Sequence, residues 1–150
     1  MNISNSFQIS ASGLTAQRLR MDVISSNIAN AETTRAQVVN GEAVPYRRKV
    51  VVMSPSQSTF QDSLQAAMQG ESSAKGVKVT QIREDAAPFK LVYNPTHPDS
   101  NAEGYVSMPN VDMAQEMVDM LSATRSYEAN VTALNASKSM IIKALEIGKG

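Results

Sequence analysis

The sequence predicts an α+β protein in which long amphipathic helices at the two ends pair as a coiled-coil-like bundle and flank a small β-rich central domain. Apolar residues recur every seven positions near the N-terminus, no Gly or Pro interrupts residues 111–147, and the middle holds short segments rich in Val and basic residues. The expected segments are an N-terminal assembly helix with its connector at 1–34, a central domain at 35–110 with a Ser- and Gln-rich loop at 54–74, and a C-terminal assembly helix at 111–150.

The composition argues against a nucleic-acid-binding, disulfide-linked or membrane-spanning protein. The 14 Lys and Arg balance 14 Asp and Glu, so no net field attracts nucleic acid or an anionic membrane, and the expected partners are proteins. The absence of Cys excludes disulfides, thiolate metal sites and a Cys nucleophile. The longest aliphatic run, Val50 to Met53, is far shorter than the roughly 20 residues of a membrane span, so no direct membrane insertion is expected.

The first residues lack the basic start and apolar stretch of a cleavable secretory signal. If the protein leaves the cytoplasm, we therefore expect a route that needs no such signal. The helix predicted from Ile3 to Ala31 has a polar face rich in Ser, Asn and Gln, which are weak helix formers, so it should be only marginally helical alone. Its apolar face is formed by Phe7, Leu14, Met21, Ile24 and Ile28.

The C-terminal helix is predicted from Val111 to Ile147, with Asp112 as its cap and Gly148 as its stop. Roughly 36 residues at about 1.5 Å each give a rod on the order of 54 Å long, more than a domain of this size can cover. Part of its apolar line should therefore contact another chain. That line comprises Met113, Met117, Met120, Thr124, Tyr127, Val131, Leu134, Lys138, Ile141 and Leu145.

Strands are predicted at Tyr46 to Met53, Gly76 to Ile82 and Phe89 to Tyr93, because these segments are short and rich in Val or aromatic residues. The intervening residues 54–73 are interpreted as a loop that includes a turn of helix. We therefore expect the β structure to lie between the two helices.

The segment from Ser25 to Thr34 has two interpretations. Asn and Thr terminate helices well, and by physics alone we favour the simple end of a helix. The segment also resembles the signature that closes the first helix of the flagellar axial proteins, which are the rod, hook and hook-associated subunits. The matching residues are Ser25, Ser26, Asn27, Ala29, Asn30, Thr33 and Thr34, whereas Arg35 and Ala36 stand where many members have a Gly.

Residues 94–112 predict a rigid bend that aims the C-terminal helix. Three Pro residues fix their own φ angles, Asp99 and Asn101 can bond to local backbone, and Gly104 permits a positive φ. This run resembles the connector of the proximal-rod members of the axial family, and the resemblance extends over nearly the whole chain. The residues that carry it here are Asn94, Pro95, His97, Pro98, Gly104, Tyr105, Pro109 and Asn110.

The resemblance implies a structural subunit of the flagellar basal-body rod. Such proteins are exported unprocessed through the flagellar type III apparatus, assemble helically around a central channel outside the cytoplasmic membrane, and transmit torque from the basal ring to the hook. The implied partners are copies of the same chain, other rod subunits, ring or adaptor proteins and the export apparatus. The expected assembly residues are Phe7, Leu14, Met21, Ile24, Ile28, Met113, Met117, Met120, Tyr127, Val131, Leu134, Ile141 and Leu145.

Catalytic interpretations have less support. His97 is the sole histidine, and a catalytic metal usually needs about three protein ligands, so we interpret it as a surface turn residue. Glu84 and Asp85 could form a carboxylate pair for hydrolysis, but adjacent acids beside Ala and Pro are more typical of a solvated loop. No catalytic residue, metal or cofactor is therefore expected.

A set of Met residues and a run of basic residues are both interpreted as structural rather than as binding sites. Four Met residues could bind a soft metal, but at helical spacing and without Cys they favour an adaptable packing surface. The basic run Arg47 to Lys49 is expected to solvate a strand edge, with an ionic contact between subunits as the alternative. The Met residues are Met108, Met113, Met117 and Met120.

Two other function classes compete with a rod subunit. A soluble helical adaptor or export chaperone would bind flagellar proteins without entering the rod, so it would be absent from purified basal bodies. A peptidoglycan hydrolase would need a catalytic acid, and no acid in the sequence, Glu84 and Asp85 included, stands in a pattern that assigns it that role.

Overall fold

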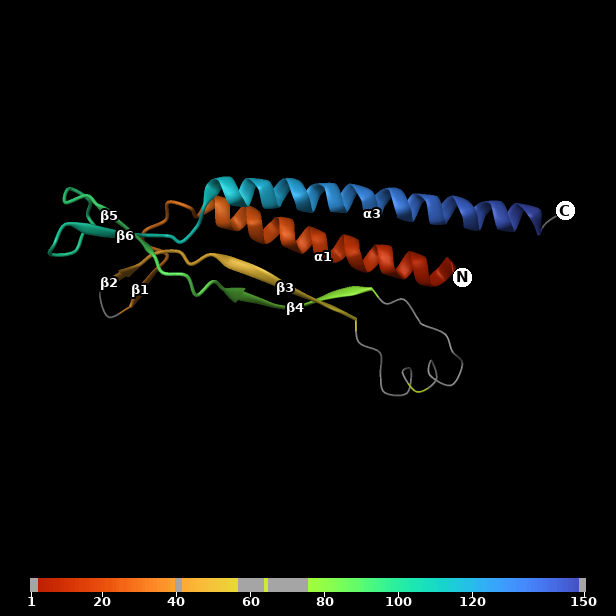
Figure 1. Ribbon diagram of the computed structural model, residues 1–150, viewed down its shortest axis with the longest axis horizontal. Helices are drawn as coiled ribbons and strands as arrows, with labels where there is room; N and C mark the ends of the chain where they lie inside the picture. The colour runs from red at the N-terminus through yellow and green to blue at the C-terminus, as the bar shows by residue number, and fades with distance from the viewer. Residues whose placement is uncertain (1–2, 40–41, 57–63, 65–75, 149–150) are drawn as a thin grey trace. The chain divides into compact units, whose positions relative to one another are not determined.

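The structure is a computed structural model that describes residues 3–39, 42–56, 64 and 76–148 (Figure 1). It confirms an α+β fold with a long helix near each end of the chain and short strands between them. The strands form three two-stranded sheets, β1 with β2, β3 with β4 and β5 with β6. The elements are α1 Ile3–Ala29, β1 Gln37–Val39, β2 Glu42–Val44, β3 Lys49–Pro55, β4 Val77–Glu84, β5 Lys90–Tyr93, β6 Tyr105–Met108 and α3 Met113–Ile147.

The chain divides into two compact units. The first contains residues 1–19, 52–81 and 123–150, and the second contains residues 20–51 and 82–122. The second unit therefore holds the end of α1, the start of α3 and both short hairpins. Over the described residues, no helix combines the length and apolar character needed to cross a bilayer.

Both helices end close to the predicted positions. Helix α1 ends at Ala29, two residues before the predicted Ala31, because Asn30 donates a side-chain hydrogen bond to Ser26 O at 2.9 Å and Thr33 N–H bonds to Asn30 O at 3.1 Å. At the start of α3, Asp112 Oδ1 accepts from Ala114 N–H at 3.0 Å, as expected of a helix cap.

The three predicted strands are present, each displaced by one to three residues. Strands β1, β2 and β6 were missed. Strand β6 lies inside the segment interpreted as a connector, where Asn and Pro residues obscure the alternation of buried Val106 with exposed Tyr105. The expected loop at 54–74 lies almost entirely outside the described residues.

The β5–β6 hairpin is antiparallel and pairs Val92 with Val106 and Tyr93 with Tyr105. The two Tyr rings meet edge to face with centroids 5.3 Å apart. Gly104 has a φ of 81°, and a Cβ there would lie 3.0 Å from the Tyr93 ring. A residue with a side chain would therefore be strained at this position in both backbone and contact.

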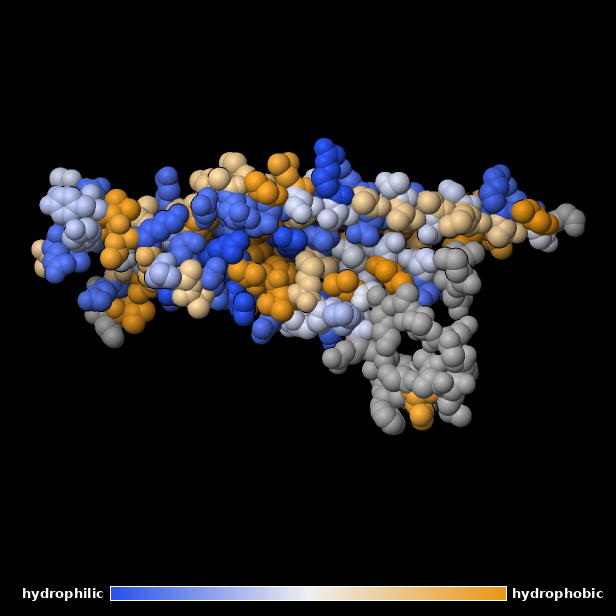
Figure 2. Space-filling view, viewed as in Figure 1, coloured by the Kyte–Doolittle hydropathy of each residue, from blue (hydrophilic) through white to orange (hydrophobic). Residues whose placement is uncertain are grey.

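In the first unit, α1 and α3 approach each other through small side chains. The buried residues on the helices of this unit are Ser10, Ala16, Ala123 and Ser137. A Cβ on Gly13 would lie 3.1 Å from the Asn130 amide nitrogen, so the two backbones come close at that point. Many larger apolar side chains of α3 remain exposed, and Figure 2 shows hydrophobic residues on its open surface.

Candidate functional site

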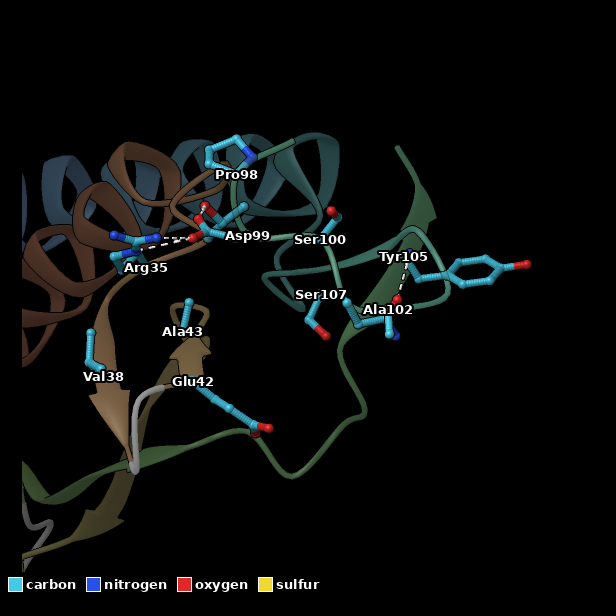
Figure 3. A pocket seen from close by; sticks show the side chains of 12 residues that line it. Arg35, Val38, Glu42, Ala43, Pro98, Asp99, Ser100, Ala102, Tyr105 and Ser107 are labelled. Atoms are coloured by element: carbon cyan, nitrogen blue, oxygen red, sulfur yellow. Dashed lines mark hydrogen bonds and ion pairs between the residues drawn. The ribbon is translucent and has the colours of Figure 1, made fainter. Parts of the chain in front are cut away.

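In the second unit, Asp99 fastens the connector after β5 to the segment that follows α1. Its carboxylate accepts hydrogen bonds from Thr34 Oγ1 at 2.9 Å and from Arg35 Nε at 3.1 Å, and it forms an ion pair with Arg35 (Figure 3). The hydrogen bond from Arg35, followed by that from Thr34, lowers the pKa of Asp99. The Asp99 N–H donates to His97 Nδ1 at 3.1 Å, so His97 closes a turn.

Beside Asp99 lies an open pocket of about 670 Å³. Figure 3 shows it between the β1–β2 hairpin and the start of β6. Over the described part of the chain, no group of three His, Asp or Glu side chains is placed to hold a metal ion. The pocket is lined by Thr34, Arg35, Val38, Glu42, Ala43, Pro98, Asp99, Ser100, Asn101, Ala102, Tyr105 and Ser107.

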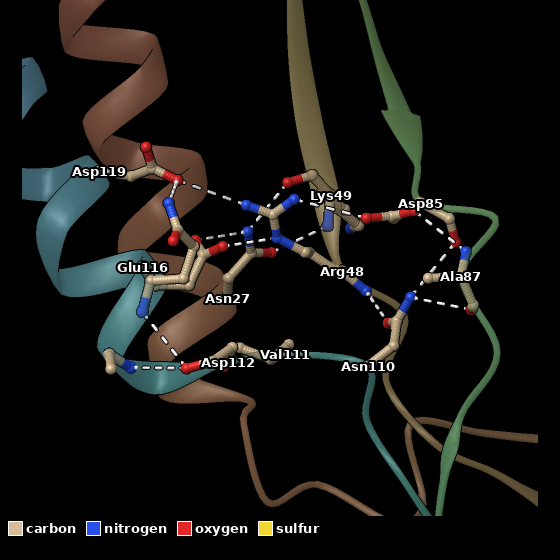
Figure 4. Close-up of polar contacts among 12 residues, drawn as sticks. Asn27, Arg48, Lys49, Asp85, Ala87, Asn110, Val111, Asp112, Glu116 and Asp119 are labelled. Atoms are coloured by element: carbon tan, nitrogen blue, oxygen red, sulfur yellow. Dashed lines mark hydrogen bonds and ion pairs between the residues drawn. The ribbon is translucent and has the colours of Figure 1, made fainter.

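The end of α1 is fixed by the buried amide of Asn27, which is 1% exposed. Its Nδ2 donates to Lys49 O at 2.9 Å and to Glu116 Oε2 at 3.0 Å. Its Oδ1 accepts from Lys49 N–H at 2.9 Å and from Tyr46 OH at 3.0 Å (Figure 4). Because both donors and both acceptor positions are used, the amide of Asn27 pairs with the Lys49 backbone much as a neighbouring strand would.

Glu116, on the first turns of α3, is also 1% exposed. Its Oε1 accepts from Arg48 Nε at 2.6 Å, while Oε2 accepts from Asn27. Burying a carboxylate is costly unless it is paired with a cation and hydrogen-bonded. Asn27 and Arg48 meet that requirement, so Glu116 joins α3 to both α1 and β3.

The guanidinium of Arg48 stands among three carboxylates. It lies 2.6 Å from Glu116, 3.4 Å from Asp85 and 3.5 Å from Asp119. Burial lowers the pKa of Arg48, but the hydrogen bonds and charges of Glu116 and Asp85 outweigh burial and raise it overall. Asp119 is shared with Arg20 of α1 at 3.3 Å, which adds a second bridge between the helices.

Asn110 ties the connector to this network. Its Oδ1 accepts from Arg48 N–H at 2.8 Å, and its Nδ2 donates to Ala87 O at 3.1 Å. The pKa of Asp85 is lowered, first by the hydrogen bond from Ala87 N–H and then by Arg48. Five separate stretches of chain therefore meet around Arg48: the end of α1, the start of β3, the turn after β4, the connector and the start of α3.

The chain is similar to known flagellar rod proteins over nearly its whole length. Two family models match, "Flagella basal body rod protein" over residues 7–37 and "Flagellar basal body rod FlgEFG protein C-terminal" over residues 102–147. The flagellar basal-body rod protein FlgC of Bacillus subtilis is 60% identical over 99% of this chain and 100% of its own length. The FlgC proteins of Salmonella typhimurium and Borreliella burgdorferi are 44% and 43% identical, over 99% and 100% of this chain and all of their own.

The chain belongs to the FlgC family of flagellar basal-body rod proteins. Its role is that of a structural rod subunit, because the relatives are rod proteins rather than enzymes. The network around Arg48 joins the two regions that the family models match, since Asn27 lies in one and Asn110 and Glu116 lie in the other.

The structure gives most residues of the FlgC-like motifs a local role. The side-chain bonds of Asn27, Asn30 and Asn110 are those described above. Thr33 Oγ1 donates to Asn30 Oδ1, and Thr33 O accepts from Tyr46 N–H at 3.0 Å. In the connector, Asn94 N–H bonds to Gly104 O at 2.9 Å. Pro95 packs near Gly104, Pro109 is buried, Pro98 lines the pocket, and Ala29 and Tyr105 are exposed.

The expected assembly residues differ in burial. Ile24 is buried in the second unit, while four are exposed, namely Phe7, Met113, Met117 and Leu145. The half-buried members are Leu14, Met21, Ile28, Met120, Tyr127, Val131, Leu134 and Ile141. The exposed members lie on surfaces that the described part of the chain does not cover.

Two sequence interpretations are corrected here. Arg48 was expected to solvate a strand edge, but its guanidinium turns toward Glu116. Asp85 was assigned to a solvated loop, yet it is partly buried and bonds to Arg48. The sequence does carry one signal for this cluster, because Glu116 and Asp119 are three residues apart and so lie on one face of α3, where a buried cation could join them.

The Asn27 amide should not tolerate an isosteric carboxylate. Asn27→Asp removes both donors and places a second carboxylate beside Glu116, so we expect the free energy of unfolding to fall by about 2–4 kcal/mol at neutral pH. The repulsion raises the pKa of the new pair, and the loss should shrink as the pH falls and one carboxyl is protonated. Urea denaturation at several pH values checks this, with exposed Asn135→Asp as the matched control. Equal losses in the two variants would contradict the role of Asn27.

Removing Arg48 should leave a buried, unpaired charge. Arg48→Met is expected to lower the free energy of unfolding by about 3–5 kcal/mol. Adding Glu116→Gln should restore part of that loss, because the buried carboxylate is then neutral. Arg125→Met is the control, since Arg125 is 81% exposed in its pair with Glu128 and should cost less than about 1 kcal/mol. Additive losses in the double variant would show that Arg48 and Glu116 are not coupled.

The pair of Arg35 and Asp99 should contribute to stability in a pH-dependent way. The pKa of Asp99 is lowered in the folded state, so its contribution is present above its unfolded pKa and is lost as the pH falls through the folded value. Arg35→Gln should raise the pKa of Asp99, which carboxyl-carbon NMR titration can measure. Arg125→Gln should leave that pKa unchanged. If Arg35→Gln also leaves it unchanged, the assigned cause is wrong.

Proposed function

We propose that this subunit forms part of the tubular wall of the rod, with α1 and α3 packed against the helices of neighbouring subunits as a coiled-coil-like layer. The observation that carries this proposal is the uncovered apolar surface of α3. Exposed large apolar residues gather near the two ends of the helix, at residues 113–121 and 140–147. They are Met113, Met117, Val118, Leu121, Met140, Ile142, Leu145 and Ile147.

Exposed clusters of large apolar side chains mark interaction surfaces. In the first unit Gly13 lies close to Asn130, and the most deeply buried helix residues, Ala16 and Ala123, are small. Small residues let the two backbones come close and leave the larger side chains directed elsewhere. Neighbouring copies, other rod subunits and ring or adaptor proteins of the basal body are the proposed partners.

The network of hydrogen bonds and ion pairs around Arg48 is suited to a rod subunit that transmits torque. A drive shaft must not let its helices rotate or slide independently of the rest of the subunit. Hydrogen bonds from Asn27, Arg48 and Asn110 connect both helices, strand β3 and the connector within the second unit. These directional contacts resist shear between elements, which a purely apolar core would resist less specifically.

The same family role supports a proposed route and location. We propose export through the flagellar type III apparatus without a cleaved signal, followed by assembly outside the cytoplasmic membrane. Segments 1–34 and 111–150 then act as assembly segments, and 35–110 as the central domain. A mass-spectrometric inventory of purified basal bodies tests this, because a rod subunit is retained there and an export chaperone is not.

A single change in the exposed apolar group at residues 140–147 should weaken assembly without unfolding the protein. Leu145 is 69% exposed, and a Lys near a helix C-terminus is electrostatically favourable, so Leu145→Lys should leave helix content unchanged. If neighbouring subunits bury this side chain, the loss per contact is on the order of 1.5–3 kcal/mol, and retention in basal bodies should fall about tenfold or more.

Ala136→Lys is the matched control for this change. Ala136 is exposed on α3, and helical geometry places it on the side opposite Leu145. Circular dichroism should show equal helix content in both variants, and swimming should be lost only in Leu145→Lys. Normal swimming and retention of Leu145→Lys would contradict the proposed seam.

A further inference from the structure

We propose that Met113 and Met117 form a reversible oxidation site that controls whether a free subunit can enter the rod. The inference rests on the proposed rod function and adds a chemical control to one of its contact surfaces. In the free chain, an oxidant of the hydrogen peroxide class converts the two thioethers to sulfoxides, and the oxidised surface no longer packs against a neighbouring subunit. Sulfoxide reductases reverse this change.

All the sulfur of this chain is in Met residues. The chain has nine Met and no Cys, so no thiol of its own competes for the oxidant. Among the described residues, three Met are exposed by 40–55% and four are half-buried. The exposed ones are Met113, Met117 and Met140, and the half-buried ones are Met21, Met53, Met108 and Met120.

Met113 and Met117 lie one helical turn apart on the same side of α3, because residues four positions apart are neighbours on a helix. Glu116, in the same turn, is 1% exposed and bonds to Asn27 of α1. That bond holds this part of α3 in place while both Met side chains stay open to solvent. A dissolved oxidant therefore has access to both without unfolding of the helix.

The reaction transfers one oxygen atom to each sulfur. A lone pair of the Met sulfur attacks one oxygen of hydrogen peroxide, so that a sulfur–oxygen bond forms and the oxygen–oxygen bond breaks. The departing hydroxide takes the proton from the transferred oxygen and leaves as water. The sulfur is oxidised by two electrons and the peroxide is reduced by two, so no further reactant is needed.

Oxidation changes a surface that we propose as a contact with a neighbouring subunit. The thioether is apolar, whereas the sulfoxide is polar and carries a hydrogen-bond acceptor. Burying that oxygen against apolar side chains without a donor is unfavourable. Val118 and Leu121, which are 60% and 65% exposed, have no sulfur, so the two Met residues are the part of this apolar group that responds to the oxidant.

Under the proposed export route, the free subunit passes through an oxidising compartment. Cytoplasmic thiols keep proteins reduced, and this protection ends outside the cytoplasmic membrane. Once a neighbouring subunit covers Met113 and Met117, the oxidant loses access to them. The site therefore acts on subunits in transit and spares those already assembled.

Peptide mapping by mass spectrometry tests the oxidation itself. The purified chain is treated with dilute hydrogen peroxide, and the gain of one oxygen atom is followed at each Met. Met113 and Met117 should react several-fold faster than half-buried Met21 and Met108, and methionine sulfoxide reductase should reverse the gain. In purified basal bodies, Met113 and Met117 should react several-fold more slowly than in the free chain. Equal rates in either comparison would overturn the proposal.

Two double variants test the consequence for assembly. Met113→Gln with Met117→Gln makes the surface permanently polar, whereas Met113→Leu with Met117→Leu keeps it apolar and resistant to oxidation. Retention in basal bodies should fall about tenfold or more for the Gln pair and stay at the natural level for the Leu pair. Ala129→Gln with Ala133→Gln, exposed and four residues apart on α3, is the matched control and should be retained. Circular dichroism should show equal helix content in all three.

The outcomes separate the oxidation site from the rod function. Natural retention of the Gln pair would show that polarity at this surface does not control assembly, and the control would be rejected while the rod function stands. Loss of the Leu pair together with the Gln pair would show that side-chain shape decides, which also overturns the proposal. Absence of the natural chain from basal bodies would instead reject the rod function, whatever the oxidation rates of the free chain.

Discussion

The ion pair between Arg48 and Glu116 is the contact on which the second unit depends. A carboxylate that is 1% exposed requires a cation and a donor at fixed positions. Arg48 and Asn27 supply them, and each is in turn held by other parts of the chain, through Asn110 and Lys49 respectively. The positions of α1, β3 and α3 in this unit therefore follow from one buried charge and the groups that neutralise it.

The polar network fixes the geometry within the subunit, whereas the apolar surfaces of α3 are left free to contact other chains. The polar network accepts few alternative geometries, because each donor and acceptor has a defined partner. The apolar surfaces of α3 are less selective and stay exposed in the isolated chain. A subunit built in this way has a defined joint in one region and adaptable Met- and Leu-rich contacts in another, where flexible Met side chains can fit neighbours of different shape.

The connector between β5 and α3 shows how local bonds support that joint. Asp99 holds the segment after α1, His97 and Asn101 close successive turns, and Asn110 contacts Arg48. The hydrogen bonds of Asn101 to Glu103 and Tyr105 position the chain for the positive φ of Gly104. The connector thus directs α3 through bonds at both of its ends rather than through the stiffness of Pro alone.

The sequence by itself determined the fold class, the extents of the two helices and three of the strands, and the motifs typical of an axial protein. These features depend on local properties, namely periodicity, caps and turn residues, which can be read from neighbouring positions. The role of Arg48 could not be read in this way, because its partners Asp85, Asn110 and Glu116 are 37, 62 and 68 positions away in the sequence. Only the tertiary structure decided that the charges of Arg48 and Glu116 face inward, since burial of a charge depends on which distant groups fold around it.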